Sequence, residues 1–157
     1  MIKTCVEFLD KMFSDNFNKV VCVYGQAATG KTTMCTVIAS SFAKAGKKVL
    51  YIDSEKGFSS DRFRQISGDD KLLDQLVIMK VNDFREQYYM VKELVELNNF
   101  DCLIIDTLTF FYRKEVKENR AKLNNMLKHH LDHLYSISKK GKLVMFTNQV
   151  YSKMESN

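Results

Sequence analysis

One stretch of eight residues has the types and spacing suited to phosphate chemistry. It reads Gly25-Gln-Ala-Ala-Thr-Gly30-Lys31-Thr32 and fits the pattern G-x-x-x-x-G-K-[ST]. Glycines let such a loop wrap so that its N–H groups face a phosphate chain, Lys31 would neutralise the outer phosphates, and Thr32 would offer a hydroxyl to Mg²⁺. The sequence therefore predicts a nucleotide-binding loop with these contacts: Gly25, Gln26, Ala27, Ala28, Thr29, Gly30, Lys31, Thr32 and Thr33.

A magnesium ion at this loop needs a second protein ligand, and the tip of a neighbouring buried strand is the expected place. Asp106 follows four apolar residues, 102–105, and would lie at the carboxyl edge of a sheet, where ligands of open α/β sheets bind. Asp53 ends another such run and competes for the role. We favour Asp106 because the run before it is more uniformly apolar.

Hydrolysis also needs a base that orients water towards the terminal phosphate. Glu55, two residues beyond the predicted strand 48–53, could supply it from the same edge of the sheet. The alternative is an exposed loop acid. Asn148 and Gln149 follow the last predicted strand and could sense a terminal phosphate, although an amide pair at a strand end is also common in turns.

Alternating apolar and amphipathic segments indicate the elements that must position these residues. Buried strands are predicted at 19–24, 48–53, 75–81, 101–106 and 143–147, the first of them buried on both faces. Helices are predicted at 4–13, 31–45, 60–67, 83–98 and 117–140. Strands that alternate with helices, with no hairpin signal, need right-handed crossovers, so we expect a mainly parallel sheet in a three-layer α/β fold.

The last predicted helix carries the clearest apolar stripe. Its members are Leu123, Met126, Leu127, Leu131, Leu134 and Ile137. His129 and His133 lie four residues apart on this helix, which is the spacing of zinc ligands, but no intervening glutamate and no obvious third ligand accompany them. We therefore expect both histidines on a solvated face.

The composition is that of an ordinary globular chain with one core. Of 157 residues, 45% are hydrophobic and 27% are charged. The four cysteines lack a C-x-x-C spacing and three lie in apolar runs, which favours buried, reduced thiols. No apolar run approaches the length of a membrane helix, and acids stand among the first hydrophobic residues. We expect a soluble cytoplasmic protein with no membrane partner.

The net charge of +5 is unevenly distributed. Residues 113–157 carry 10 Lys and Arg against 4 Asp and Glu, a net charge of +6, whereas residues 1–112 have a net charge of −1. A polyanion that binds the last third would explain this excess, and so would a merely solvated basic face.

Four stretches, in this order, resemble the ATPase core of the RecA-type recombinases: VCVYGQAATGKTT, VLYIDSEKGFSSDRFRQI, DCLIIDTLTFFYR and VMFTNQVYS. The similarity runs from about Val20 to Ser152 and also includes VNDFREQ. It is strongest to RadB, the short archaeal paralogue that lacks the N-terminal DNA-binding domain of RadA. The resemblance implies a single RecA-like ATPase domain over residues 1–157, with ATP and Mg²⁺ as cofactors. Relatives continue with further C-terminal strands, which this domain is expected to lack.

The resemblance also implies roles for single residues. Lys31 and Thr32 would bind the phosphates and Mg²⁺, and Asp106 would be the Walker B acid. Glu55 matches the catalytic glutamate and Arg62 matches the arginine that stacks on adenine. Gln149 matches the amide that links the terminal phosphate to a DNA-binding loop.

In these recombinases two DNA-facing loops follow the Walker B strand and the strand that ends in TNQ. Here they correspond to about 111–120 and to residues from 150 onward, both in the basic third. The resemblance implies contacts to DNA, single-stranded DNA in particular, by these residues: Arg113, Lys114, Lys117, Arg120 and Lys153. The resemblance thus implies a nucleoid-associated accessory protein in recombination and repair. Its expected partners are DNA and repair proteins, and it could form an oligomer.

This sequence departs from the family pattern in three places. The first loop lacks the glycines of strand-exchange proteins, which argues against strand exchange, and Lys56 stands beside Glu55 where many relatives have glycine. Relatives continue with further strands beyond the position of Asn157, and a chain without those strands is expected to hydrolyse ATP weakly. Three alternatives stay open: a non-catalytic, nucleotide-gated interaction protein, a P-loop small-molecule kinase, and a KaiC-like regulatory ATPase.

Overall fold

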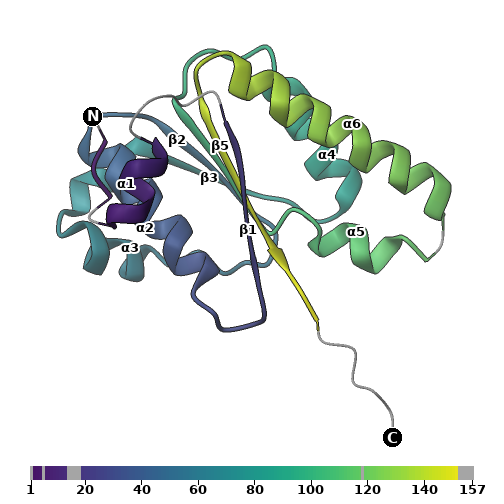
Figure 1. Ribbon diagram of the computed structural model, residues 1–157, viewed down its shortest axis with the longest axis horizontal. Helices are drawn as coiled ribbons and strands as arrows, with labels where there is room; N and C mark the ends of the chain where they lie inside the picture. Colours follow the sequence, from purple (N-terminus) through teal and green to yellow (C-terminus); the bar gives the residue numbers. More distant parts are fainter. Residues whose placement is uncertain (1, 5, 14–18, 118, 152–157) are drawn as a thin grey trace, which may run out of the picture.

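The computed structural model describes residues 2–4, 6–13, 19–117 and 119–151, which form a five-stranded sheet between two layers of helices (Figure 1). The elements are, in chain order, α1 (Glu7–Phe13), β1 (Val20–Gly25), α2 (Lys31–Lys44), β2 (Val49–Asp53), α3 (Ser60–Ser67), the 3₁₀-helix η1 (Asp70–Gln75), β3 (Leu76–Lys80), α4 (Phe84–Leu94), β4 (Cys102–Asp106), α5 (Phe110–Glu115), α6 (Arg120–Lys139) and β5 (Leu143–Gln149).

All four strand pairings are parallel, and the strand order is β1-β5-β4-β2-β3. In this register Asp53 lies beside Asp106, and Gly25 lies beside Gln149. Parallel strands that end together bring the residues after them to one edge of the sheet. The predicted three-layer α/β fold with a parallel sheet is therefore confirmed, and its carboxyl edge carries Asp106, Gln149 and the start of the glycine loop.

Each face of the sheet has its own apolar core. Alternate residues of β2, such as Val49 and Tyr51, face α1, α2 and α3, whereas Leu50 and Ile52 face α4 and α6. The central strands β2 and β4 are buried along their whole length. These two strands carry Asp53 and Asp106 at their tips, so both carboxylates are held by rigid backbone.

The first strand differs from its prediction. Among the described strands β1 pairs only with β5, so it lies at the edge of the sheet and is not buried on both faces. Cys22 and Tyr24 are exposed, Tyr24 to 72%. An apolar run alone does not tell an edge strand from a central one. The same result corrects the cysteine prediction, since Cys35 and Cys102 are buried but Cys22 is not.

The segment after β4 differs as well. Residues 110–115 form α5 where a DNA-facing loop is predicted from residue 111, and α6 begins only at Arg120. In the α6 stripe, Leu131 is 41% exposed, while His130, which lies outside the predicted stripe, is fully buried. None of the helices in the described part of the chain is long and apolar enough to cross a membrane.

Candidate nucleotide site

The loop between β1 and α2 has a backbone that depends on its glycines. Gly30 has φ +86°, in the left-handed region that glycine adopts without strain. At Gly25 a Cβ would lie 2.8 Å from Thr29 Oγ1, which is too close for any other residue without a shift. Thr29 Oγ1 in turn donates to the carbonyl of Gln26 at 2.9 Å and closes the turn. The loop encloses a cavity of about 260 Å³ lined by Ala28, Thr29, Gly30, Lys31, Thr32 and Thr33.

The phosphate-binding features expected of this loop are present in its geometry. Lys31 Nζ folds back over the loop and donates to the carbonyls of Gly25, at 3.1 Å, and Gln26, at 2.6 Å. Helix α2 starts immediately after Gly30, with no acidic residue in its first turn and no side chain capping its first N–H groups. Free N–H groups and the positive end of the helix dipole favour an anion at this position. The loop therefore fits a phosphate chain.

Asp106 lies at the bottom of this site and contacts the loop helix directly. Its Oδ2 accepts hydrogen bonds from Thr32 Oγ1, at 2.7 Å, and from Tyr51 OH, at 3.0 Å. Its Oδ1 accepts from Thr147 Oγ1 at 2.5 Å. A hydroxyl and a carboxylate oxygen in contact are the hard ligands that Mg²⁺ takes. The residues present therefore fit a magnesium ion, which Thr32 and Asp106 would hold.

Asp53, the competing carboxylate, binds main-chain N–H groups of the loop that follows β2. Its two oxygens accept the main-chain N–H groups of Gly57, at 2.9 Å, and Phe58, at 3.1 Å. It thus fixes the loop after β2, and no hydrogen bond joins it to Thr32 among the described residues. The geometry favours Asp106 over Asp53 as the second metal ligand.

Buried protonated groups surround the carboxylate of Asp106. Burial, and then the nearby Cys35 and Asp106, raise the pKa of Tyr51 above its ordinary value, so its hydroxyl stays a donor. Burial likewise raises the pKa of the Cys35 thiol. Tyr51 and Thr147 were missed as site residues. The only sequence signal is a hydroxyl-bearing residue within an otherwise apolar strand.

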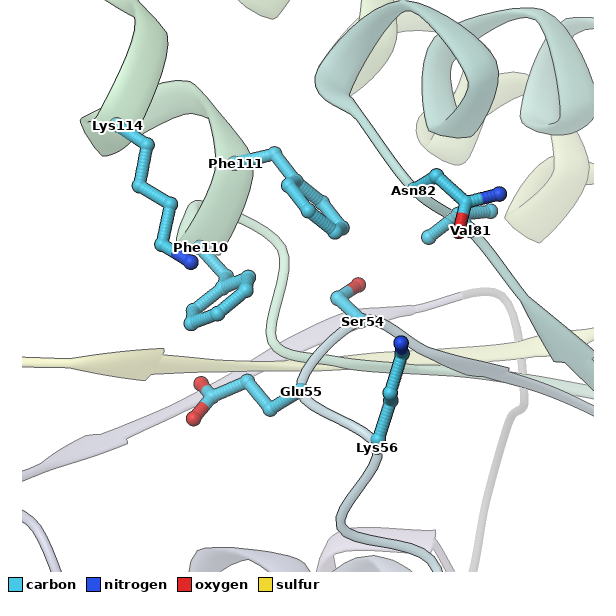
Figure 2. Close-up of a pocket in the computed structure, with 8 residues that line it drawn as sticks. All are labelled: Ser54, Glu55, Lys56, Val81, Asn82, Phe110, Phe111 and Lys114. Atoms are coloured by element: carbon cyan, nitrogen blue, oxygen red, sulfur yellow. The ribbon is translucent and has the colours of Figure 1, made fainter.

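Glu55 lies on the loop after β2 and is exposed. Its Oε1 accepts a hydrogen bond from Thr107 Oγ1 at 2.5 Å, so it is joined to the residue that follows Asp106. The side chains of Glu55 and Lys56 extend in different directions (Figure 2). A second cavity, of about 270 Å³, opens beside them and is lined by Ser54, Glu55, Lys56, Val81, Asn82, Phe110, Phe111 and Lys114.

Asn148 and Gln149 are the last two residues of β5, which extends further than the predicted strand 143–147, and they lie next to the loop 25–32, called here the phosphate loop. Gln149 pairs in register with Gly25, and its main-chain carbonyl accepts from Arg113 Nη1 at 2.6 Å. Asn148 Oδ1 accepts from Thr109 Oγ1 at 2.9 Å. The Gln149 side chain makes no hydrogen bond to the described part of the chain, which leaves its amide available to a ligand beside the loop.

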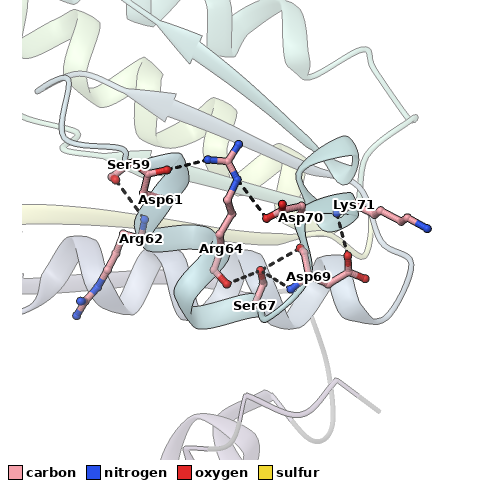
Figure 3. A network of polar contacts seen from close by, with 8 residues as sticks. All are labelled: Ser59, Asp61, Arg62, Arg64, Ser67, Asp69, Asp70 and Lys71. Carbon is pink, nitrogen blue, oxygen red and sulfur yellow. Dashed lines mark hydrogen bonds and ion pairs between the residues drawn. The ribbon is translucent and has the colours of Figure 1, made fainter.

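Arg62 is on α3, in the layer of helices that also contains α2. It extends away from the ion pairs that Arg64 forms with Asp61, at 2.7 Å, and Asp70, at 3.2 Å (Figure 3). Within the described ranges its guanidinium has no hydrogen-bond or ion-pair partner. In the described part of the chain, no hydrogen bond joins Arg62 to the phosphate loop.

The five basic residues predicted to contact DNA differ in their surroundings. Arg113, besides its bond to Gln149, lies 5.0 Å from the centre of the Tyr151 ring, and Lys114 Nζ lies 3.9 Å from that of Phe110. Lys117 and Arg120 are exposed at the junction of α5 and α6. Lys153 lies outside the described residues. Arg113 is therefore partly engaged within the chain, whereas Lys117 and Arg120 face solvent.

The histidines of α6 form no metal site with other described residues, among which no group of three possible metal ligands occurs. His129 is exposed, as expected, and lies 3.7 Å from Asp132. His133 differs from the prediction because it is half-buried and lies against the Tyr88 ring, with 5.6 Å between the ring centres and the rings tilted by 50°.

A parallel sheet in this strand order, with a glycine loop between β1 and α2 and a strand-tip acid against the loop threonine, defines a P-loop domain of the RecA-like fold. A family model described as an AAA domain matches residues 16–150. A solved structure, the crystal structure of the RadB recombinase, superposes with a TM-score of 0.79 at 30% identity, covering 99% of this chain and 73% of that one.

Relatives in archaea agree with this structural match. The DNA repair and recombination protein RadB of Methanococcoides burtonii is 34% identical over 95% of this chain and 70% of its own length. The RadB protein of Methanoculleus marisnigri is 36% identical over 85% of this chain and 62% of its own length. The chain therefore belongs to the RadB family of RecA-type proteins.

Proposed function

We propose that this chain binds ATP with Mg²⁺, hydrolyses it slowly, and acts as a DNA-binding accessory in DNA repair and recombination. The observation that carries the proposal is the 2.7 Å contact between Thr32 and Asp106 beneath an open glycine loop. The names of the relatives, DNA repair and recombination proteins, support the biological role.

In this proposal the loop residues bind the phosphates. Lys31 exchanges its two carbonyl contacts for outer phosphate oxygens, and the N–H groups at the start of α2 point at the phosphate chain. Thr32 and Asp106 would hold Mg²⁺, which supplies charge neutralisation at the phosphates. Tyr51 and Thr147 keep the Asp106 carboxylate oriented from β2 and β5.

Glu55 is the proposed base that orients the attacking water. Its carboxylate is exposed and is fixed by one described hydrogen bond, from Thr107, so bulk water competes for it. A base that is poorly shielded and loosely held is expected to give slow turnover, because positioning supplies much of the rate of phosphoryl transfer. Gln149 would sense the terminal phosphate, and Arg62 would stack on adenine.

The test of the nucleotide site is Lys31→Ala. Loss of two charge-assisted hydrogen bonds costs about 3 kcal/mol, so we expect MgATP to bind roughly a hundredfold more weakly in a calorimetric titration. Lys44→Ala, an exposed lysine at the other end of α2, is the matched control and should bind normally. A folded Lys31→Ala protein that bound and cleaved ATP like the wild type would overturn the assignment.

A second candidate function is a nucleotide-gated interaction protein in which hydrolysis is incidental. The bonds from Thr109 to Asn148 and from Arg113 to Gln149 favour it, because they connect the strand end beside the phosphates to α5. Glu55→Gln separates the two candidates. If Glu55→Gln has lost ATP turnover but still binds and releases DNA or a partner in response to nucleotide, the chain acts as a nucleotide-gated interaction protein. If binding and release stop, the function depends on ATP hydrolysis.

A further inference from the structure

Gln87, on α4, is a fully buried amide that bridges two loops at the carboxyl edge of the sheet. Ser54 Oγ donates to its Oε1 at 2.7 Å, and its Nε2 donates to the carbonyl of Leu108 at 2.9 Å. A carbonyl oxygen can only accept a hydrogen bond, so the nitrogen of the amide must face Leu108 and the oxygen must face Ser54. The orientation of Gln87 is thus determined by its two partners.

The two bridged loops are those that carry Glu55 and its hydrogen-bond donor. Ser54 immediately precedes Glu55, and Leu108 immediately follows Thr107, which donates to Glu55 at 2.5 Å. The same loops are also joined through their main chains, since Ser54 N donates to the carbonyl of Asp106 at 2.9 Å. Gln87 therefore ties together, from a third element, the two backbones whose relative position sets the Glu55–Thr107 contact.

We propose that Gln87 is a positioning residue for Glu55, an inference that rests on the proposed ATPase function. Gln87 contacts no candidate ligand position itself: it is buried behind the loops, and Ser54 alone of its partners lines the cavity in Figure 2. Its effect passes through Ser54 and Leu108 to the side chain of Glu55, which lies at the surface.

The side chain at position 87 must both accept from a hydroxyl and donate to a carbonyl. An ionised glutamate can accept from Ser54 but cannot donate to Leu108, and its charge would face a carbonyl oxygen in a buried site. A protonated glutamate can do both. Methionine has nearly the same length and can do neither, so Gln87→Met removes both bonds with little change in volume.

The experiment measures ATP turnover, MgATP affinity and thermal unfolding for Gln87→Met and Gln87→Glu. For Gln87→Met we expect kcat to fall roughly tenfold to a hundredfold, with KM and the calorimetric Kd for MgATP within about twofold of wild type, because only the base is displaced. Gln65→Met, at an exposed position on α3, is the matched control and should change neither parameter.

Gln87→Glu gives a readout that a merely structural role would not. Burial raises the pKa of a carboxyl group, so we expect the kcat of Gln87→Glu, relative to wild type, to recover as the pH falls from 8 to 6 and the glutamate regains its donor. The measurement is the ratio of the two kcat profiles under conditions where both proteins are folded by circular dichroism.

Separate outcomes identify separate failures. Wild-type protein without ATP turnover would overturn the proposed ATPase function itself. Active wild type with a Gln87→Met variant of equal kcat, or one that loses MgATP affinity in step with kcat, would overturn the positioning role alone. If Gln87→Met does not fold, Ser54→Ala removes one of the two bonds without burying a new group. We expect a smaller kcat loss from it, about threefold to tenfold, and unchanged kcat would overturn the inference.

Discussion

The chemistry of the site is concentrated on one carboxylate. Asp106 is only 5% exposed and accepts hydrogen bonds from three hydroxyls, on α2, β2 and β5. Such bonds to the ionised form compensate for the burial of a charge. They also fix the direction of its lone pairs. Residues around a metal ligand that do this tune affinity for the metal without touching it.

Tyr51→Phe tests whether the hydrogen bond from Tyr51 to Asp106 affects the affinity for Mg²⁺, because it removes the hydroxyl and keeps the buried ring. We expect the Mg²⁺ concentration for half-maximal nucleotide binding to rise about tenfold, with near-normal affinity for ATP at saturating Mg²⁺. The stability cost should be about 1 kcal/mol. Tyr24→Phe, on the exposed face of β1, is the control. An unchanged Mg²⁺ dependence in Tyr51→Phe would show that Asp106 does not need this donor.

The sequence predicts the glycine loop between a strand and a helix, which the structure has, but it does not predict the residues that form hydrogen bonds around it. The loop can be recognised from the sequence because phosphate binding requires certain residue types at a fixed local spacing, here Gly25, Gly30, Lys31 and Thr32. Tyr51, Thr147 and Gln87 meet their partners only across strands or between layers. Their contacts depend on the strand order β1-β5-β4-β2-β3. Local periodicity in the sequence does not predict that order.

At the scale of elements, the pairing of α4 with α6 shows the same limit. Periodicity predicts α6 and most of its buried stripe, since Leu123, Leu134 and Ile137 are buried, but it does not predict every buried position. Leu131 is exposed, and His130 is buried against Phe84 and Tyr88 of α4, with ring centres 5.7 and 6.1 Å apart. Neither nitrogen of His130 has a hydrogen-bond partner in the described chain. Packing against α4 determines which residues of α6 are buried, and the sequence of α6 alone does not contain that information.

This burial predicts a pH-dependent stability. Burial, and then the nearby His133, lower the pKa of His130 to about 3, against about 6.5 in an unfolded chain. The folded state thus binds fewer protons, so the stability is fully present above pH 6.5 and declines as the pH falls towards 3. At about 1.4 kcal/mol per pH unit, urea unfolding at pH 5 should show a loss of about 2 kcal/mol relative to pH 7.5.

His130→Leu should remove that part of the pH dependence, since it replaces the buried imidazole with an apolar group. His129→Leu, on the exposed side of the same helix, should keep it. The pKa of His133 is also lowered by partial burial, so some dependence of the same sign remains in His130→Leu. Identical unfolding profiles for His130→Leu and wild type would contradict this account.

At the scale of the whole molecule, the parallel sheet brings the candidate nucleotide site and the basic third of the chain towards the same edge. Gln149 pairs beside Gly25 of the phosphate loop, and its carbonyl is bound by Arg113 of α5. The end of α5 leads directly to Lys117 and Arg120, which are exposed and have no ion-pair partner in the described ranges. A polyanion bound there would lie against an element already joined to the strand end beside the glycine loop.

Salt titration of binding to single-stranded DNA tests whether this basic junction is a phosphate-binding surface. Each phosphate contact releases condensed counterions, so the slope of log affinity against log salt is about −0.7 per contact for a single strand. We expect Lys117→Ala to weaken binding and to make the slope less negative by about 0.7, as measured by fluorescence anisotropy. Lys44→Ala, exposed on α2 in the opposite helix layer, removes the same charge from the molecule and should leave the slope unchanged. Equal slope changes for the two variants would mean that net charge acts at long range, and that the junction of α5 and α6 has no contact of its own with DNA.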